Sequence, residues 1–359
     1  MLKITCIADI HFGKLNDDDR LYDELKNGFI KHCNETKPDI IVICGDSYDS
    51  RQLINSKANI NYQKFIDDCR DTGAIIIVIE GTESHDRYQI NSLLHYSSDR
   101  FFIINTVTKL NILGMKFLIV PEEYVKDSSY YDEYLNDTYD FIFGHGMSSH
   151  VGFSDKSISD EIMKKPFIWE AKELEKICKN YTVFGHIHTH SVYHNFIYCG
   201  SYSRLNFGEM EAKGFIDLIE TKKGWKYEFI ENKQAPTFTD IFMTKLPNDI
   251  DSLLNQLRGY QENSDYLRIV IDQDDENKAN TIKGFVKNHD NCCIKQAIKK
   301  KTDEKEISDN IQEQQALLSS RMDKYKGLSF MEITLKIAKD EYHTDFTQEE
   351  VNSILNTQI

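Results

Sequence analysis

The sequence predicts a layered α/β domain, followed by a small α+β unit and a helical tail. Continuous apolar runs of strand length, such as DIIVIC and AIIIVI, are typical of strands covered on both faces. Helix-compatible segments alternate with the first of these runs, whereas the later runs follow one another closely. We therefore expect a sheet that begins parallel and becomes mixed or antiparallel.

The expected elements follow in order along the chain. Strand and helix patterns alternate at the start, with strands at 2–9, 39–44 and 74–79 and helices at 19–36 and about 56–72. Further strand-like runs lie at 101–105, 116–120, 139–144, 181–185, 196–200, 214–220 and 225–231. Together they predict one large domain over residues 1–235.

The pattern of apolar and polar residues changes after Pro236. Residues 236–301 predict a small unit with strands at 266–272 and 292–298 and a helix at about 277–288. Residues 302–359 predict a polar linker and a helical tail. In that tail, Phe330, Ile333 and Ile337 form an apolar stripe at helical spacing.

Composition limits the class of protein. The chain has 359 residues, enough for two domains, and a net charge of −15, the wrong overall sign for a nucleic-acid binder unless positive charge is clustered locally. The eight cysteines show no CxxC spacing, which indicates reduced thiols and a cytoplasmic protein. No apolar stretch approaches the ~20 residues of a membrane span, so no membrane association is expected.

Residues of types that commonly bind metals follow five of the predicted strands. They are Asp9 and His11, Asp46, the Ser84-His85-Asp86 group, His145, and the pair His186 and His188. Ligands in layered α/β sheets gather beyond the carboxyl ends of strands, so these side chains predict a pocket holding more than one metal. Mixed carboxylate and imidazole ligands suit Mn²⁺, Zn²⁺ or Fe. A carboxylate such as Asp46 can bridge two ions, as in two-metal phosphoester hydrolases.

The order of these motifs, DxH, GDxxD, SHD, GH and GHIH, resembles that of the calcineurin-like metallophosphoesterases. A narrower resemblance lies in Cys199–Glu209, CGSYSRLNFGE, followed by Lys213-Gly214-Phe215. This segment resembles the SbcD-type (Mre-type) DNA repair nucleases, including phage versions. The motifs cover about residues 1–235, and the rest of the chain matches in layout only.

The resemblance implies a four-layer αββα sandwich and a role for each motif residue. Asp9, His11, Asp46 and His188 would hold one metal, and Asp46, His145 and His186 the other. His85 would stabilise the transition state or protonate the leaving oxygen, and Asp49 and Asp86 would orient the ligands. Arg204 would lie near the pocket and contact a phosphate. The implied cofactor is two Mn²⁺ per chain, with Mg²⁺ or another divalent ion as alternatives.

One motif departs from the family pattern. Where the family has Gly-Asn-His-Asp, this chain has Gly81-Thr82-Glu83-Ser84-His85-Asp86, which is two residues longer and lacks the asparagine ligand. We expect Ser84, next to His85, to replace that ligand. Glu83 and Thr82 remain alternatives.

The implied partners are DNA and an SbcC-like SMC-family ATPase. A basic segment at 277–301 offers phosphate contacts; its predicted substrate-binding residues are Lys295, Lys299, Lys300 and Lys301. The tail would bind the ATPase, and two copies of each subunit would form a homodimeric complex. The expected activity is exonuclease action on duplex ends and endonuclease action on single strands.

Two other functions fit the same residues. A small-molecule phosphatase or nucleotide phosphodiesterase on this fold would have no use for the lysines or the tail. A non-catalytic DNA-end-binding scaffold would follow if the altered third motif had cost the protein a metal.

Overall fold

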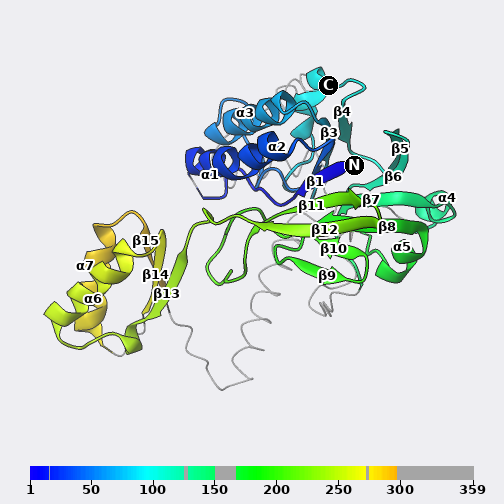
Figure 1. The fold of residues 1–359 in the computed structure, drawn as a ribbon. Helices are drawn as coiled ribbons and strands as arrows, with labels where there is room; N and C mark the ends of the chain where they lie inside the picture. Colours follow the sequence, from blue (N-terminus) through cyan, green and yellow to red (C-terminus); the bar gives the residue numbers. More distant parts are fainter. Residues whose placement is uncertain (16, 125–127, 150–166, 272–274, 297–359) are drawn as a thin grey trace, which may run out of the picture. The chain divides into compact units, whose positions relative to one another are not determined.

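The computed structural model describes all residues except 16, 125–127, 150–166, 272–274 and 297–359 (Figure 1). Met1–Gln296 form one compact unit. The predicted linker and tail at 302–359, together with the last residues of the predicted small unit, lie outside the described residues. Within the described part, the strands form three sheets.

The first sheet is parallel at one end and antiparallel at the other. Its strand order is β12-β11-β1-β2-β3-β4, in which β1 to β4 run parallel and β11 pairs antiparallel with β1. This confirms the predicted change from a parallel to a mixed sheet. The bounds are β1 Lys3–Ile7, β2 Ile40–Cys44, β3 Ile75–Ile79, β4 Phe101–Ile104, β11 Gly214–Thr221 and β12 Gly224–Glu231.

The second sheet has the order β5-β6-β7-β8-β10-β9. Its central strands β6, β7, β8 and β10 are parallel, and its two edge strands are antiparallel to their neighbours. The bounds are β5 Thr108–Ile112, β6 Met115–Val120, β7 Tyr139–His145, β8 Cys178–Gly185, β9 Ser191–Tyr193 and β10 Phe196–Tyr198.

Helices cover the outer face of each sheet. On the first sheet lie α1 (Asp18–Leu25), α2 (Lys31–Thr36) and α3 (Lys57–Asp71), with a π-helical turn between α1 and α2 (Figure 1). Helix α3 begins where the Ser56 hydroxyl accepts a hydrogen bond from the amide of Asn59, an N-cap that satisfies a free donor of the first turn. The short helices α4 (Asp132–Leu135) and α5 (Ala171–Ile177) lie on the second sheet.

The inner faces of the two sheets pack against each other. Val42 and Ile77 of the first sheet belong to the same buried cluster as Phe117, Phe141 and Phe143 of the second. The continuous apolar runs are explained by this arrangement, because each central strand is buried on both faces. The fold is therefore a four-layer αββα sandwich, as predicted.

The small unit has a parallel three-stranded sheet with two helices. Its elements are β13 (Phe238–Phe242), α6 (Ile250–Glu262), β14 (Tyr266–Ile271), α7 (Glu276–Lys287) and β15 (Cys292–Gln296). Leu253, Leu267 and Ile282 form part of its own core. The sequence predicted β14, α7 and β15. It did not predict β13 or α6, and the strict β-α-β-α-β alternation makes this unit a parallel α/β layer.

Candidate metal centre

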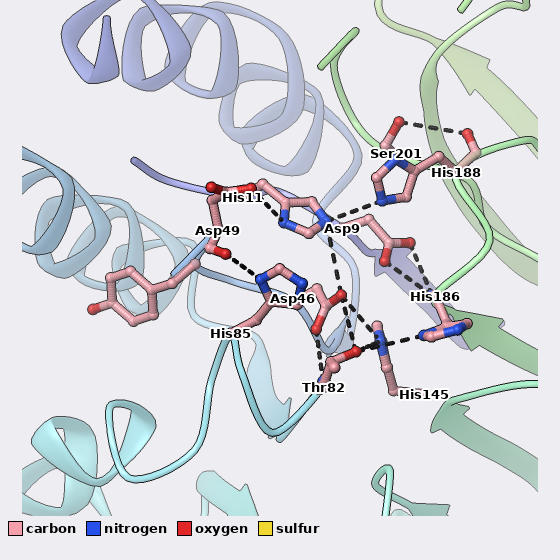
Figure 2. A network of polar contacts seen from close by, with 12 residues as sticks. Asp9, His11, Asp46, Asp49, Thr82, His85, His145, His186, His188 and Ser201 are labelled. Atoms are coloured by element: carbon pink, nitrogen blue, oxygen red, sulfur yellow. Dashed lines mark hydrogen bonds and ion pairs between the residues drawn. The ribbon is translucent and has the colours of Figure 1, made fainter. Parts of the chain in front are cut away.

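The candidate ligands meet at the carboxyl ends of strands from both large sheets. Asp9 follows β1, Asp46 follows β2, and Thr82 and His85 follow β3. From the second sheet, His145 ends β7, and His186 and His188 follow β8. In Figure 2 these side chains point toward one another from the two sheets.

Glycines allow the two sheets to approach at this edge. A Cβ atom at Gly45 would overlap the His145 imidazole, and one at Gly185 would overlap the Cys44 carbonyl oxygen. A Cβ at Gly81 would overlap Asp46. These positions therefore require glycine, because any side chain would push the ligands apart.

Several candidate ligands have an uncommon backbone conformation. Asp9, His11, Asp46 and His186 have φ angles of 50°, 55°, 49° and 94°, in the left-handed region that non-glycine residues rarely adopt. Such conformations persist where the surrounding structure enforces them, and they cluster at functional sites. Here they turn each side chain into the space between the sheets.

Asp9, His11 and His188 form the first cluster. Each offers one ligand atom, and the three atoms lie within 4.8 Å of one another. The Nε2 atoms of His11 and His188 are 3.0 Å apart. The amide of His186 donates to both carboxylate oxygens of Asp9, at 2.9 and 3.1 Å, which fixes that carboxylate in the cluster.

Asp46, His145 and His186 form the second cluster, also within 4.8 Å. His145 donates from Nδ1 to the Cys44 carbonyl at 2.8 Å, which leaves Nε2 facing Asp46 Oδ2 at 3.3 Å. The same Oδ2 lies 3.7 Å from His11 Nε2. Asp46 thus faces both clusters, as a bridging ligand must.

His85 lies beside the first cluster with Asp49. Its Nδ1 donates to the Asp49 carbonyl, and its ring is 5.0 Å from that of His11, edge to face. The Asp49 carboxylate binds Lys14 at 2.9 Å. Asp86 is buried and accepts from the amides of Ser47, Tyr48 and Gly81, so it joins the loops after β2 and β3.

Burial and neighbouring charges set the protonation of these groups. It lowers the pKa of His11 to about 3, so this imidazole is neutral and has a free lone pair for a cation. Burial alone would raise the pKa of Asp46, but the neighbouring His145 holds it well below its ordinary value. For Asp86, burial and the nearby Asp46 raise the pKa to about 7.

The donor set fits divalent metal ions. His11 Nδ1 is buried without a hydrogen-bond partner, and its Nε2 lies 3.0 Å from the Nε2 of a second candidate ligand, His188. Buried polar atoms normally have partners, so this convergence of lone pairs and carboxylates is explained by cations. Nitrogen and oxygen ligands together favour Mn²⁺, Zn²⁺ or Fe over Ca²⁺.

Ser84 is not brought into either cluster. Its residue is exposed, and the neighbouring Glu83 is exposed and pairs with Arg87. Thr82 lies in the centre instead. Its amide donates to Asp46 Oδ1 at 2.7 Å, and its hydroxyl is 3.4 Å from His145 Nε2. The two additional residues turn the loop outward after Thr82, which corrects the expectation for Ser84.

Sequence reasoning missed two acidic residues at the site. Glu122 Oε2 lies 3.1 Å from His186 Nδ1, and Glu209 Oε1 lies 3.5 Å from His188 Nδ1. Glu122 follows β6, another strand of the second sheet, so its position after a predicted strand was an available signal. Glu209 lay in the FGE segment that carries the narrower resemblance.

Arg204 and the lysines lie elsewhere. The Arg204 guanidinium donates to the carbonyls of Ala235, Pro236 and Glu211, so it ties down the segment leading into the small unit, and no contact with the clusters is present among the described residues. Lys278, counted in the basic segment, is buried and donates to the Leu246 carbonyl.

Of the predicted substrate-binding lysines, Lys295 is exposed on β15. Lys299, Lys300 and Lys301 lie outside the described residues.

A protein-family model described as calcineurin-like phosphoesterase matches residues 2–190. The chain belongs to this family. The match contains all the residues of both clusters, and the chain is therefore a metal-dependent phosphoester hydrolase. No helix in the described part is both long and apolar enough to cross a membrane.

Other comparisons add little. The search of curated proteins finds no match for this chain. A crystal structure of a protein of unknown function from Aquifex aeolicus is similar over 52% of this chain and 80% of that chain, with 15% sequence identity and a TM-score of 0.24.

Proposed function

We propose that this phosphoester hydrolase is a DNA nuclease with two Mn²⁺ ions per chain. It would degrade duplex ends and cut single strands as the nuclease subunit of an SbcCD-like repair and recombination complex. The observation that supports this most is the contact between the SbcD-like segment and the metal centre. Glu209 of that segment faces His188, and Lys213 donates to the His188 carbonyl at 2.9 Å. The segment thus supports a ligand directly.

The residues of the two clusters would hold the ions and align the substrate phosphate. Asp9, His11 and His188 would hold one cation, His145 and His186 the other, and Asp46 both. Two such cations supply Lewis acidity that polarises the phosphate and lowers the pKa of the attacking water. Asp86 and Thr82 keep Asp46 and its loop in place through the hydrogen bonds described above.

In this proposal His85 would move the proton. Because its Nδ1–H is held by the Asp49 carbonyl, the other ring nitrogen, Nε2, is the one available to a substrate. As the water oxygen bonds to phosphorus and the bond to the 3′ or 5′ oxygen breaks, Nε2 would give its proton to that leaving oxygen. His85 would then regain a proton from solvent.

The small unit offers a surface for the DNA backbone. Lys283 and Lys287 of α7 and Lys295 of β15 are exposed, and lysines so placed can contact phosphates in a chain of net negative charge. The ATPase partner, its attachment through the tail and the homodimer remain part of this proposal.

The test uses the full chain with end-labelled linear duplex DNA and with circular single-stranded DNA, each with Mn²⁺. The matched variant is Asp46→Asn, which keeps the size of the side chain but removes the charge shared by both clusters. We expect wild type to shorten the duplex and cut the circle. EDTA should abolish both activities. Asp46→Asn should reduce them by about 100-fold or more, because it weakens the binding of both cations and loss of an outer partner of a ligand alone costs about 10- to 100-fold.

The outcome also separates the alternatives. If wild type leaves both DNAs intact but hydrolyses bis(p-nitrophenyl) phosphate, the protein is a small-molecule phosphodiesterase. If it binds the duplex and hydrolyses neither substrate, it is a scaffold.

A further inference from the structure

We propose that Glu122 is an anionic ligand of the second cation and takes the place of the amide ligand missing from the third motif. The inference rests on the two-cation centre of the proposed function and assigns a residue that the motif pattern does not contain. It explains how a centre that has lost one neutral oxygen ligand can still hold two ions.

The position of Glu122 is set by the second sheet. It lies two residues beyond the end of β6, which runs parallel to β7 with Val120 opposite Gly144. The next residue of β7, His145, belongs to the second cluster. Glu122 therefore lies at the same edge of the sheet as His145, because the carboxyl ends of neighbouring parallel strands meet at one edge.

The carboxylate is buried and aimed at the cluster. The Glu122 side chain is 2% exposed, and its Oε2 lies 3.1 Å from His186 Nδ1 and 3.3 Å from the Thr82 hydroxyl. The Thr82 hydroxyl in turn lies within 3.5 Å of His186 Nδ1, His145 Nε2 and Asp46 Oδ2. Oε2 therefore lies beside the atoms that would surround the second cation.

A tyrosine holds the other carboxylate oxygen. Tyr124 donates its hydroxyl hydrogen to Glu122 Oε1 at 3.0 Å. This fixes the carboxylate plane and keeps Oε2 directed at His186 and Thr82, the arrangement by which an outer hydrogen bond orients a metal ligand.

The adjacent Glu123 has a different use. Its Oε2 accepts from the Val107 amide and the Tyr131 hydroxyl, and its Oε1 from the Tyr130 hydroxyl. Both oxygens are thus engaged with neighbours outside the two clusters, although Glu122 and Glu123 line the same cavity of about 350 Å³. Glu123 is a control matched in charge and chain position, and it lines the same cavity without facing the clusters.

Replacing an amide by a carboxylate changes the charge of the site. Glu122 adds one negative charge to the charge of Asp46 that the second cluster shares with the first, whereas a neutral asparagine would add none. We therefore expect this cation to be bound tightly despite the altered loop after β3.

The experiment is a titration of the metal-free full chain with Mn²⁺. Calorimetry measures the binding steps, and electron paramagnetic resonance detects a spin-coupled pair of ions. Wild type should bind two ions and give the coupled signal. Glu122→Gln should weaken one of the two binding steps by about 10- to 100-fold or more and lose the coupled signal at low Mn²⁺. Glu123→Gln should behave as wild type.

Two results would overturn the proposal: Glu122→Gln that binds both ions as tightly as wild type, or wild type that binds a single ion. Should Glu122→Gln fail to fold, Tyr124→Phe keeps the carboxylate and removes only its fixing hydrogen bond, and it should weaken the same step by a smaller factor. A wild type that binds two ions but leaves DNA intact would reject the nuclease while the comparison of Glu122→Gln with Glu123→Gln still decides this proposal.

Discussion

In the first half of the metal centre, Asp9 and His11 come from one strand end and His188 comes from another. In the second half, Asp46, His145 and His186 come from three different strand ends. The first half therefore depends more on local spacing, and the second on three strand ends meeting. In the lengthened loop after β3, Thr82 and not Ser84 lies beside the second cluster, together with Glu122.

This difference indicates which ligands of a family's metal centre can be replaced. A ligand pair two residues apart cannot be replaced piecemeal, because one backbone segment aims both side chains. A ligand from a separate loop can be replaced by any oxygen that another strand end brings to the same space. In this chain β6 brings such an oxygen with Glu122.

The largest effect on catalysis is expected from His85→Gln, because His85 is the proposed proton donor to the leaving oxygen and not a proposed ligand of either half. Loss of general-acid catalysis should lower kcat on DNA by about 10²- to 10⁴-fold, while both Mn²⁺ binding steps stay unchanged. The measurement is steady-state cleavage beside Mn²⁺ calorimetry. On a p-nitrophenyl phosphodiester, whose leaving group needs no proton, the loss should be much smaller.

The exposed His95, which bonds only to the Ser92 carbonyl among the described residues, provides the matched control His95→Gln. An equal loss on both substrates would contradict proton donation. A lost binding step would make His85 a ligand and would blur the distinction between the halves.

A smaller effect is expected from Glu209→Gln, which should weaken Mn²⁺ binding in the first half of the centre only. Burial alone would raise the pKa of Glu209, but hydrogen bonds from His188 and Lys213 lower it to about 2, so it is a carboxylate beside His188. Removing that charge should weaken one Mn²⁺ step by about 10- to 100-fold. The Mn²⁺ binding step that Glu122→Gln weakens should be unchanged in Glu209→Gln. Calorimetry of the double variant should then show losses of binding free energy that are the sum of those of the two single variants.

Glu211→Gln, an exposed change two residues along, is the control. If Glu209→Gln and Glu122→Gln weakened the same step, the two halves would not be independent sites.

The sequence predicted the layers and most of the ligand set because these depend on local patterns. Apolar runs such as 40–44 identify strands buried on both faces, and glycine with Asp or His after a strand identifies ligands. Glu122 carried no such pattern, because its contact with His186 exists only once β6, β7 and β8 pair. Ser84 was expected from adjacency to His85, but adjacency in a lengthened loop does not determine direction.

One lysine of the predicted basic segment was misjudged for a related reason. Lys278 was counted by charge alone, although Lys278, Ile282 and Phe285 lie at i, i+4 and i+7 and thus on one face of a helix. That face is buried in the core of the small unit, and the ammonium group is accommodated by Leu246 and Asn248. Helical periodicity would have separated this lysine from the exposed Lys283 and Lys287.

The smallest effect on the metal centre is expected from a buried carboxyl group outside both halves. Glu24 of α1 accepts hydrogen bonds from Ser203 and Asn232 at 2.8 and 3.1 Å, and its side chain is 6% exposed. Arg20 links Glu24 to Asp265 of the small unit. Burial raises the pKa of Glu24 to about 7. The change Glu24→Gln should leave both Mn²⁺ steps as in wild type.

Its effect should instead lie in the pH dependence of folding. The folded state keeps the Glu24 proton that the unfolded chain releases above pH 4.5. The contribution of protonated Glu24 to the free energy of unfolding is therefore complete below pH 4.5 and is lost as the pH rises through about 7. Glu24→Gln does not titrate, so its free energy of unfolding relative to wild type should increase by about 2 kcal/mol between pH 5 and pH 8. Urea unfolding of the metal-free chain at each pH measures this, with the exposed Glu35→Gln as control. Asp86, whose pKa is also raised, is present in both proteins and cancels in the difference. A difference that stays constant with pH would show that Glu24 is already ionised in the folded state, held by Arg20 instead of by its proton.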